Sequence, residues 1–154
     1  MDSIDRKILS ILQSNARTPL KVIAEQVFLS SPAVSARIER LESSGLIAGY
    51  QAQLSAAAMG YQIKAFISLE IEPRQKPEFY PYVEKCPNVM ECNCVTGDYS
   101  MLLKVCFHTT QELDQFINQL DQFGRTRTQI VFSTPVEHRG VPAEDQESAE
   151  SERR

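Results

Sequence analysis

The sequence predicts an α+β protein with an N-terminal, three-helix, winged-type helix-turn-helix domain and a C-terminal ferredoxin-like βαββαβ domain. Three observations support this prediction. Through residues 3–45 apolar residues recur every three to four positions, which is helical spacing. From Tyr61 they alternate with polar residues, as in strands with one buried face. The later segments follow the order strand, helix, strand, strand, helix, strand, which is the ferredoxin-like order.

Three helices are expected in the first 45 residues, beginning at Ser3, at Thr18-Pro19 and at Ser30-Ser31-Pro32. Serine and threonine cap helix N-termini, and proline is well tolerated in the first turn. Gly45 follows the third helix, as expected after a helix end. The predicted buried faces hold Ile4, Ile8, Leu9, Ile11 and Leu12, then Leu20, Ile23, Ala24 and Val27, then Val34, Ile38 and Leu41. The tight breaks between these helices are typical of a helix-turn-helix.

The C-terminal half is expected to hold four strands and two helices. The strands are predicted at residues 61–72, 88–96, 99–107 and 126–134. One helix spans residues 77–85, and the other begins at Thr109 or Thr110 and is stopped by Gly124. With both helices on one face, the other face needs a cover, because Phe66, Leu102 and Cys106 point there. A second subunit is the expected cover.

This pattern divides the chain into a helix-turn-helix domain at 1–50, a linker at 51–60, a second domain at 61–139 and a tail at 140–154. The tail has no apolar periodicity and is expected to be disordered. The N-terminus has no signal-peptide layout and no apolar run approaches membrane length, so a cytoplasmic protein is expected.

Composition excludes little on its own. The net charge of −4 argues against nucleic acid, although residues 1–50 hold six Lys/Arg against five Asp/Glu. The four cysteines lack the C-x-x-C spacing of metal or redox sites, so no metal or other cofactor is expected. Without a nucleophile–base pair or a phosphate-binding glycine loop, an enzyme is not expected.

The third helix carries the residues expected to contact DNA, since the second helix of a helix-turn-helix enters the major groove. Burying its apolar face leaves Ser31, Ser35, Arg37 and Arg40 outward, with Pro32 in the first turn. Arginine binds guanine or phosphate through paired hydrogen bonds. The alternative is that both arginines only pair with acids such as Glu39 or Glu42.

Several segments resemble the Lrp/AsnC (leucine-responsive and asparagine regulator, or feast/famine) transcription factors. Ile4-Asp5-Arg6-Lys7-Ile8-Leu9 is similar to the first helix of that family, and residues 29–50 are similar to its recognition helix and exit. Val95-Thr96-Gly97-Asp98-Tyr99 resembles its ligand-domain signature, and Arg125-Thr126-Arg127-Thr128 its last-strand motif. The resemblance covers about residues 2–136.

This resemblance implies a promoter-binding regulator that forms dimers through paired C-terminal sheets, often assembled into octamers, with amino acids or related metabolites as effectors. The implied effector residues are Gly97, Asp98, Tyr99, Ser100, Thr126 and Thr128. Ser100 departs from the family, in which a second acid often stands at that position. An effector-binding or assembly module without direct DNA binding remains the alternative, and the salt dependence of duplex affinity separates the two.

Overall fold

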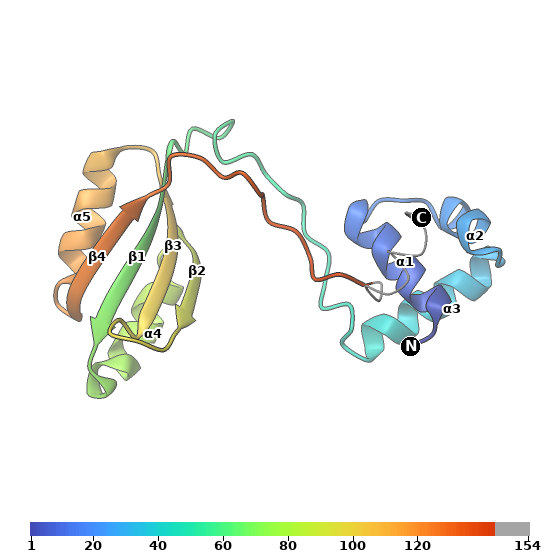
Figure 1. Ribbon diagram of the computed structural model, residues 1–154, viewed down its shortest axis with the longest axis horizontal. Helices are drawn as coiled ribbons and strands as arrows, with labels where there is room; N and C mark the ends of the chain where they lie inside the picture. The colour runs from blue at the N-terminus through green and yellow to red at the C-terminus, as the bar shows by residue number, and fades with distance from the viewer. Residues whose placement is uncertain (144–154) are drawn as a thin grey trace, which may run out of the picture. The chain divides into compact units, whose positions relative to one another are not determined.

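The computed structural model describes residues 1–143 of the chain, which form two compact units (Figure 1). Met1–Ala52 form the first unit together with residues 137–143, and Gln53–Val136 form the second. Residues 144–154 of the predicted tail lie outside the described part. Among the described residues, no helix is long and apolar enough to cross a membrane.

The N-terminal unit consists of α1 (Ser3–Ser14), α2 (Leu20–Val27) and α3 (Ser31–Ser43), which confirms the three predicted helices. They share one core, formed by Ile8, Ile23, Ala24, Val27, Val34 and Leu41. Residues 44–62, all within the described part, hold no strand, so the hairpin of a winged domain does not follow α3. The unit is therefore a helix-turn-helix made of helices alone.

Two predicted N-caps were wrong. The cap of α1 is Asp2 rather than Ser3. The Asp2 carboxylate accepts a hydrogen bond from the Asp5 amide, and the Asp2 amide donates one to the Asp5 carboxylate. Pro19 caps α2, and the Thr18 hydroxyl donates to the Asn15 carbonyl instead. The third helix begins within the predicted Ser30-Ser31-Pro32 segment, and its cap is Ser30.

Leu20 is 41% exposed and does not belong to the predicted buried face of α2. It is the first residue of the helix, and the buried positions begin one turn later at Ile23. Helical spacing alone places Leu20 on the same side as Ala24 and Val27, but it cannot show where the packed face ends.

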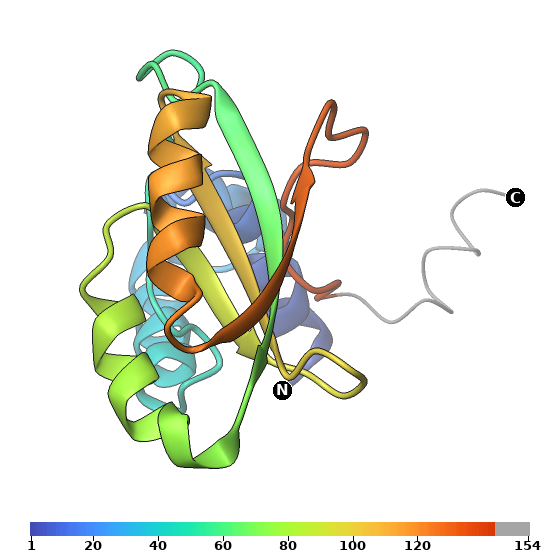
Figure 2. The same ribbon diagram turned by 90° about the vertical axis from the view of Figure 1, so that its left-hand side faces the viewer.

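The C-terminal unit is a four-stranded antiparallel sheet of β1 (Ile63–Ile71), β2 (Val89–Cys94), β3 (Met101–Phe107) and β4 (Gly124–Ile130), in the order β2-β3-β1-β4. A 3₁₀ turn, η1 (Pro73–Gln75), leads into α4 (Lys76–Glu84), and α5 (Thr110–Leu120) follows β3. Both helices lie on one face of the sheet (Figure 2). This confirms the ferredoxin-like prediction.

The core lies between the two helices and the facing side of the sheet. The alternation in β1 is as predicted: Ala65, Ile67, Leu69 and Ile71 point to the helices. From the helices come Phe79, Val83, Leu113, Phe116 and Leu120. The even-numbered residues of β1 and the residues that pair with them point to the other face of the sheet. That face therefore holds Phe66, Leu102, Lys104, Cys106 and Arg125.

Gly124 does not stop α5, as the sequence suggested, but begins β4. The helix has already ended at Leu120, and Gly124 pairs with Ile71 in the sheet. Its φ of +153° and the close approach of the Glu70 carbonyl leave no room for a Cβ atom. As a result β4 starts and ends earlier than residues 126–134.

Candidate functional site

The position of α3 follows from its cap and its buried face. The Ser30 hydroxyl accepts a hydrogen bond of 3.3 Å from the Ala33 amide, and Pro32 stands in the first turn. Val34 and Leu41 are fully or almost fully buried, which fixes the side of the helix that faces the core. Of the five predicted DNA-contacting residues, Pro32 and Arg40 are exposed, whereas Ser31, Ser35 and Arg37 are half-buried.

Arg37 and Arg40 converge on the carboxylate of Asp5 in α1. Arg37 Nη1 donates to Asp5 Oδ1 and to Asp2 Oδ2, both at 2.7 Å. Arg40 Nη2 lies 2.9 Å from each oxygen of Asp5. The Asp5 side chain is only 2% exposed, whereas those of Arg37 and Arg40 are 24% and 61% exposed. Charge-assisted hydrogen bonds therefore join the first and third helices.

These contacts shift the ionisation of the two acids. Burial raises the pKa of Asp5, but hydrogen bonds from the Asp2 amide and from Arg37 outweigh it, so the pKa of Asp5 is lowered from 3.8. The hydrogen bonds from the Asp5 amide and from Arg37 lower the pKa of Asp2 to about 2. Both acids carry a negative charge at neutral pH beside the two arginines.

The ion-pairing alternative for the two arginines is thus present in the structure, but with acids that the sequence analysis missed. Glu39 and Glu42 do not hold them: Glu39 accepts from the Ser35 hydroxyl at 3.2 Å, and Glu42 accepts from the Tyr50 hydroxyl at 2.8 Å. The spacing of the two acids at a helix start indicates a capping box, but it carries no signal for their contacts with the arginines. Contact with DNA stays a prediction for both arginines.

The predicted effector turn joins β2 to β3. Gly97 has a φ of +108°, a conformation that glycine adopts without strain, and both Gly97 and Asp98 are exposed. The Val95 amide donates to the Ser100 carbonyl at 2.9 Å, which closes the turn. Its backbone and one carboxylate therefore face the solvent, where a small polar molecule can reach them.

Ser100 ties this turn to the end of the central strand. Its hydroxyl donates to the Ile71 carbonyl at 3.3 Å and accepts from the Ile71 amide at 3.4 Å. A carboxylate at this position could accept from the amide, but it could not donate to the carbonyl. Ser100 is therefore a structural anchor of the turn as well as a candidate effector contact.

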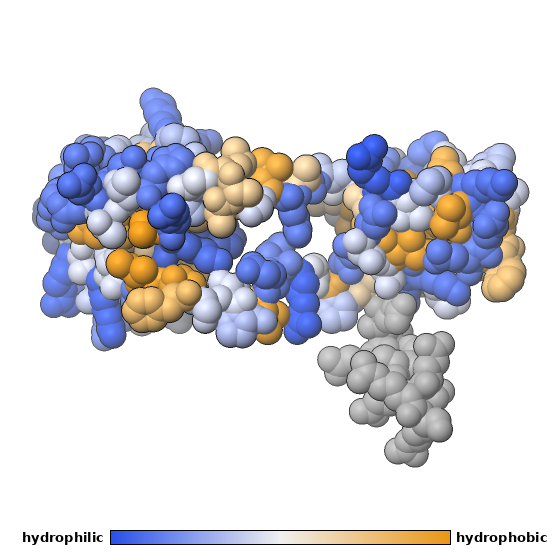
Figure 3. All heavy atoms as spheres, turned by 90° about the horizontal axis from the view of Figure 1, so that it is seen from above, coloured by the Kyte–Doolittle hydropathy of each residue, from blue (hydrophilic) through white to orange (hydrophobic). Residues whose placement is uncertain are grey.

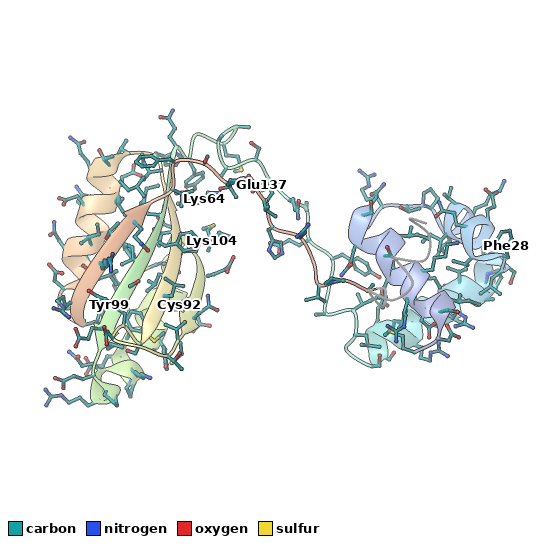
Figure 4. All side chains as sticks on the ribbon, in the orientation of Figure 1. Phe28, Lys64, Cys92, Tyr99, Lys104 and Glu137 are labelled. Carbon is teal, nitrogen blue, oxygen red and sulfur yellow. The ribbon has the colours of Figure 1, made fainter. Side chains whose placement is uncertain are left out.

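Tyr99 lies close to the first residues of β4. The guanidinium carbon of Arg125 is 5.8 Å from the centre of the Tyr99 ring, within the range of a cation–π contact. Arg125 also pairs with Glu70 at 3.0 Å. Figure 4 shows Tyr99 at the end of the sheet from which the turn projects. The structure thus places Arg125 and Glu70 next to the predicted turn residues.

Thr126 and Thr128 do not share a face with Arg125. They pair with Leu69 and Ile67, whose side chains point to the helices, and both threonines are half-buried. Because side chains alternate along a strand, Arg125 points to the opposite face. The predicted effector residues therefore form two groups within one chain: the turn from Gly97 to Ser100, and the two threonines of β4.

The cysteines are free within the described residues, and no cluster of three or more potential metal-binding side chains is found there. Cys92 packs against the sheet core, and burial raises the pKa of its thiol. Cys94 lies on the same face of β2, because the two cysteines are two residues apart in the strand, and its sulfur is 3.7 Å from Lys76 Nζ.

Comparison with known proteins identifies both units. Residues 1–42 match the model of the AsnC-type helix-turn-helix domain, and residues 64–141 match that of the Lrp/AsnC ligand binding domain. The HTH-type transcriptional regulator FL11 of Pyrococcus furiosus is 32% identical over 145 residues, covering 92% of this chain and 96% of its own length. LrpA of Bacillus subtilis is 33% identical over 133 residues, covering 86% and 98%.

Solved structures agree with this assignment. A transcriptional regulator from Neisseria meningitidis, solved in complex with L-Met, superposes with a TM-score of 0.84 at 27% identity, over 90% of this chain and 94% of that one. A feast or famine regulatory protein from M. tuberculosis, complexed with L-methionine, has a TM-score of 0.82 at 28% identity, with 92% and 98% covered. This chain belongs to the Lrp/AsnC family of transcriptional regulators.

Proposed function

We propose that the chain is a DNA-binding transcriptional regulator that acts in the cytoplasm and senses an amino acid or a related metabolite. The observation that carries the proposal is the pairing of a helix-turn-helix unit with a ferredoxin-like unit, each matched by its own Lrp/AsnC domain model. The first unit would bind promoter DNA through α3, and the second would bind the effector and a second subunit.

In the proposed DNA complex, the N-terminal turn of α3 enters the major groove. Ser31, Pro32 and Ser35 stand on that part of the helix, and the two serine hydroxyls can bond base edges or phosphates. Arg40 is more exposed than Arg37 and has further guanidinium donors, so it can bind a phosphate while it remains paired with Asp5. Arg37 would act mainly by holding α3 against α1.

In the proposed effector site, Asp98 takes the ammonium group of an amino acid, and the exposed backbone amides of the Gly97–Ser100 turn take its carboxylate. Tyr99 and Ser100 would border the site, while Thr126 and Thr128 would contribute from β4. The two relatives solved with methionine support an amino acid as the class of ligand.

Assembly is part of the proposal. The sheet face that α4 and α5 leave uncovered holds Phe66 and Leu102, both only half-buried in a single chain. Figure 3 shows a mostly hydrophilic surface interrupted by separate hydrophobic areas. Pairing of two such sheet faces would form a homodimer, and association of dimers into an octamer would bring effector turns together.

A duplex-binding titration tests the DNA half of the proposal. The probes are a random-sequence duplex of about 30 base pairs, long enough for two half-sites, and a duplex enriched from that pool by repeated selection. Affinity should fall steeply with salt, because phosphate contacts release counterions. The double substitution Ser31→Ala with Ser35→Ala should lower the affinity for the enriched duplex more than the affinity for the random pool. Ser3→Ala in α1 should change neither affinity. Salt-independent or undetectable binding would favour an assembly module instead.

A thermal-shift screen of the proteinogenic amino acids at millimolar concentration tests the effector half. A ligand that binds only the folded chain raises its melting temperature. Asp98→Asn should remove that shift and leave the ligand-free melting temperature unchanged, because Asp98 is exposed. Asp114→Asn, an exposed acid of α5, should keep the shift. If no amino acid raises the melting temperature, the assigned effector class is wrong.

A further inference from the structure

Phe28 occupies the turn between α2 and α3 in a conformation that non-glycine residues rarely adopt. Its φ and ψ are +56° and +43°, in the left-handed region, and it is the one non-glycine residue with positive φ among the described residues. Its amide and that of Leu29 both donate to the Ala24 carbonyl, which ends α2. The turn thus requires a left-handed residue at this position.

Glycine meets that requirement without strain, whereas phenylalanine does not. The aromatic ring gives no packing in return, because Phe28 is 90% exposed. Figure 4 shows its side chain at the outer edge of the N-terminal unit. Two unfavourable features, a strained backbone and a solvated ring, therefore coincide at one residue. Backbone strain of this kind is concentrated at functional positions.

The ring is close in sequence to the part of α3 that would enter DNA. Phe28 precedes the Ser30 cap by two residues, and Ser31 and Pro32 form the first turn of the helix. Phe28 therefore stands in the turn that leads directly into the proposed DNA-reading helix. An exposed apolar ring at the edge of the major groove can contact the C5-methyl group of thymine, a feature that cytosine lacks.

We infer that Phe28 is a specificity-determining residue that contacts a thymine methyl group at the edge of each half-site. This inference deepens the proposed DNA binding and rests on it. The contact is apolar, so it adds sequence preference without adding a phosphate contact. It would complement Ser31 and Ser35, which read base edges only through hydrogen bonds.

Three substitutions of Phe28 separate a DNA contact from a structural role. Phe28→Gly and Phe28→Asn remove the ring and suit the left-handed backbone, so the melting temperature should stay the same or rise. Their affinity for the enriched duplex should nevertheless fall by about fourfold or more, the value expected for losing one buried methyl contact. Phe28→Leu keeps an apolar group and should retain most of the affinity.

The salt dependence supplies a second readout. Because no charge is removed, the slope of log affinity against log salt should be the same for Phe28→Gly and the native chain. Arg40→Ala, in contrast, should reduce that slope by about one. A smaller slope for Phe28→Gly would indicate that the substitution disturbs phosphate contacts, and would overturn the assignment of an apolar base contact.

Replacing thymine by uracil in the enriched duplex, one position at a time, tests the contact directly. Uracil lacks only the methyl group. Replacing thymine at one symmetric pair of positions should therefore lower the affinity of the native chain by about fourfold. Phe28→Gly should show no loss there. Equal losses for both proteins, or none for the native chain, would overturn the inference.

These outcomes are distinguishable from failure of the proposed function. If the native chain binds no duplex, DNA binding itself is refuted, and the inference with it. If the native chain binds and Phe28→Gly binds equally well, only the inference is refuted. Light scattering of each variant tests the alternative that the Phe28 ring packs against a second copy of the chain. In that case, removing the ring would lower the mass of the oligomer, and the inference would be refuted.

Discussion

The buried carboxylate of Asp5 accepts a hydrogen bond of 2.7 Å from Arg37, which joins the third residue of α1 to the middle of α3. Asp5 also takes part in the capping box of α1 and contacts Arg40. One side chain therefore fixes the start of the first helix and its packing against the third. The orientation of the proposed DNA-reading helix depends on this ion pair.

Arg37→Ala should destabilise the N-terminal unit by about 2 kcal/mol, because it leaves the buried Asp5 carboxylate with Arg40 as its remaining cation. Urea unfolding followed by circular dichroism measures this change. Lys7→Ala, at an exposed position of α1, is the control and should stay within about 0.5 kcal/mol of the native chain. Equal stability of Arg37→Ala and Lys7→Ala would contradict the structural role.

Acid should weaken the same unit in a defined pH window. The folded pKa of Asp2 is about 2 and that of Asp5 is below 3.8, so both acids stabilise the folded state when ionised. This contribution is complete above the unfolded pKa near 4 and is lost as the pH falls toward 2. Melting temperatures between pH 5 and pH 2 should decline less steeply for Asp2→Asn than for the native chain. An identical decline would argue against the lowered pKa.

Gly124→Ala should destabilise the C-terminal unit by about 3 kcal/mol or more, because the new Cβ would collide with the Glu70 carbonyl in the sheet. Gly97→Ala is a matched control. Gly97 also has a positive φ, but no atom lies within 4 Å of the added Cβ, so strain of about 1 kcal/mol is expected. Thermal unfolding compares the two variants, and similar losses would contradict a specific clash at Gly124.

Phe66→Asp should dissociate the proposed dimer, since it introduces a charge into the apolar part of the uncovered sheet face. Light scattering coupled to size exclusion should then show a monomer that remains folded by circular dichroism. Thr110→Asp, on the exposed side of α5, should keep the native mass. A native mass for Phe66→Asp would place the dimer contact elsewhere.

The fold was largely predictable because local rules and tertiary packing agree. The alternation in β1 and the spacing in α5 each identify one buried face, and the structure buries those faces. One error arose because two neighbouring side chains could each have capped the same helix. Asp2 rather than Ser3 caps α1, and only the structure shows that the carboxylate reaches the Asp5 amide.

The candidate site was predictable in position but not in its connections. Helical spacing identified Arg37 and Arg40 as outward residues, but their acidic partners lie more than thirty residues away in sequence, at the start of another helix. The role of Gly124 depended on the approach of a carbonyl from β1, which no local pattern reveals. Long-range contacts of this kind follow from the fold rather than from nearby residues.

The alternation of β1 also has a consequence for how the gene can change. Its odd-numbered residues belong to the core and its even-numbered residues to the surface proposed for subunit pairing. Inserting or deleting one codon between Lys64 and Ile67 would move the residues that follow to the opposite face, exposing Ile67 and Leu69 while turning Glu70 toward the core. Point substitutions can alter one function of the strand at a time, whereas a single in-frame insertion would disrupt folding and assembly together.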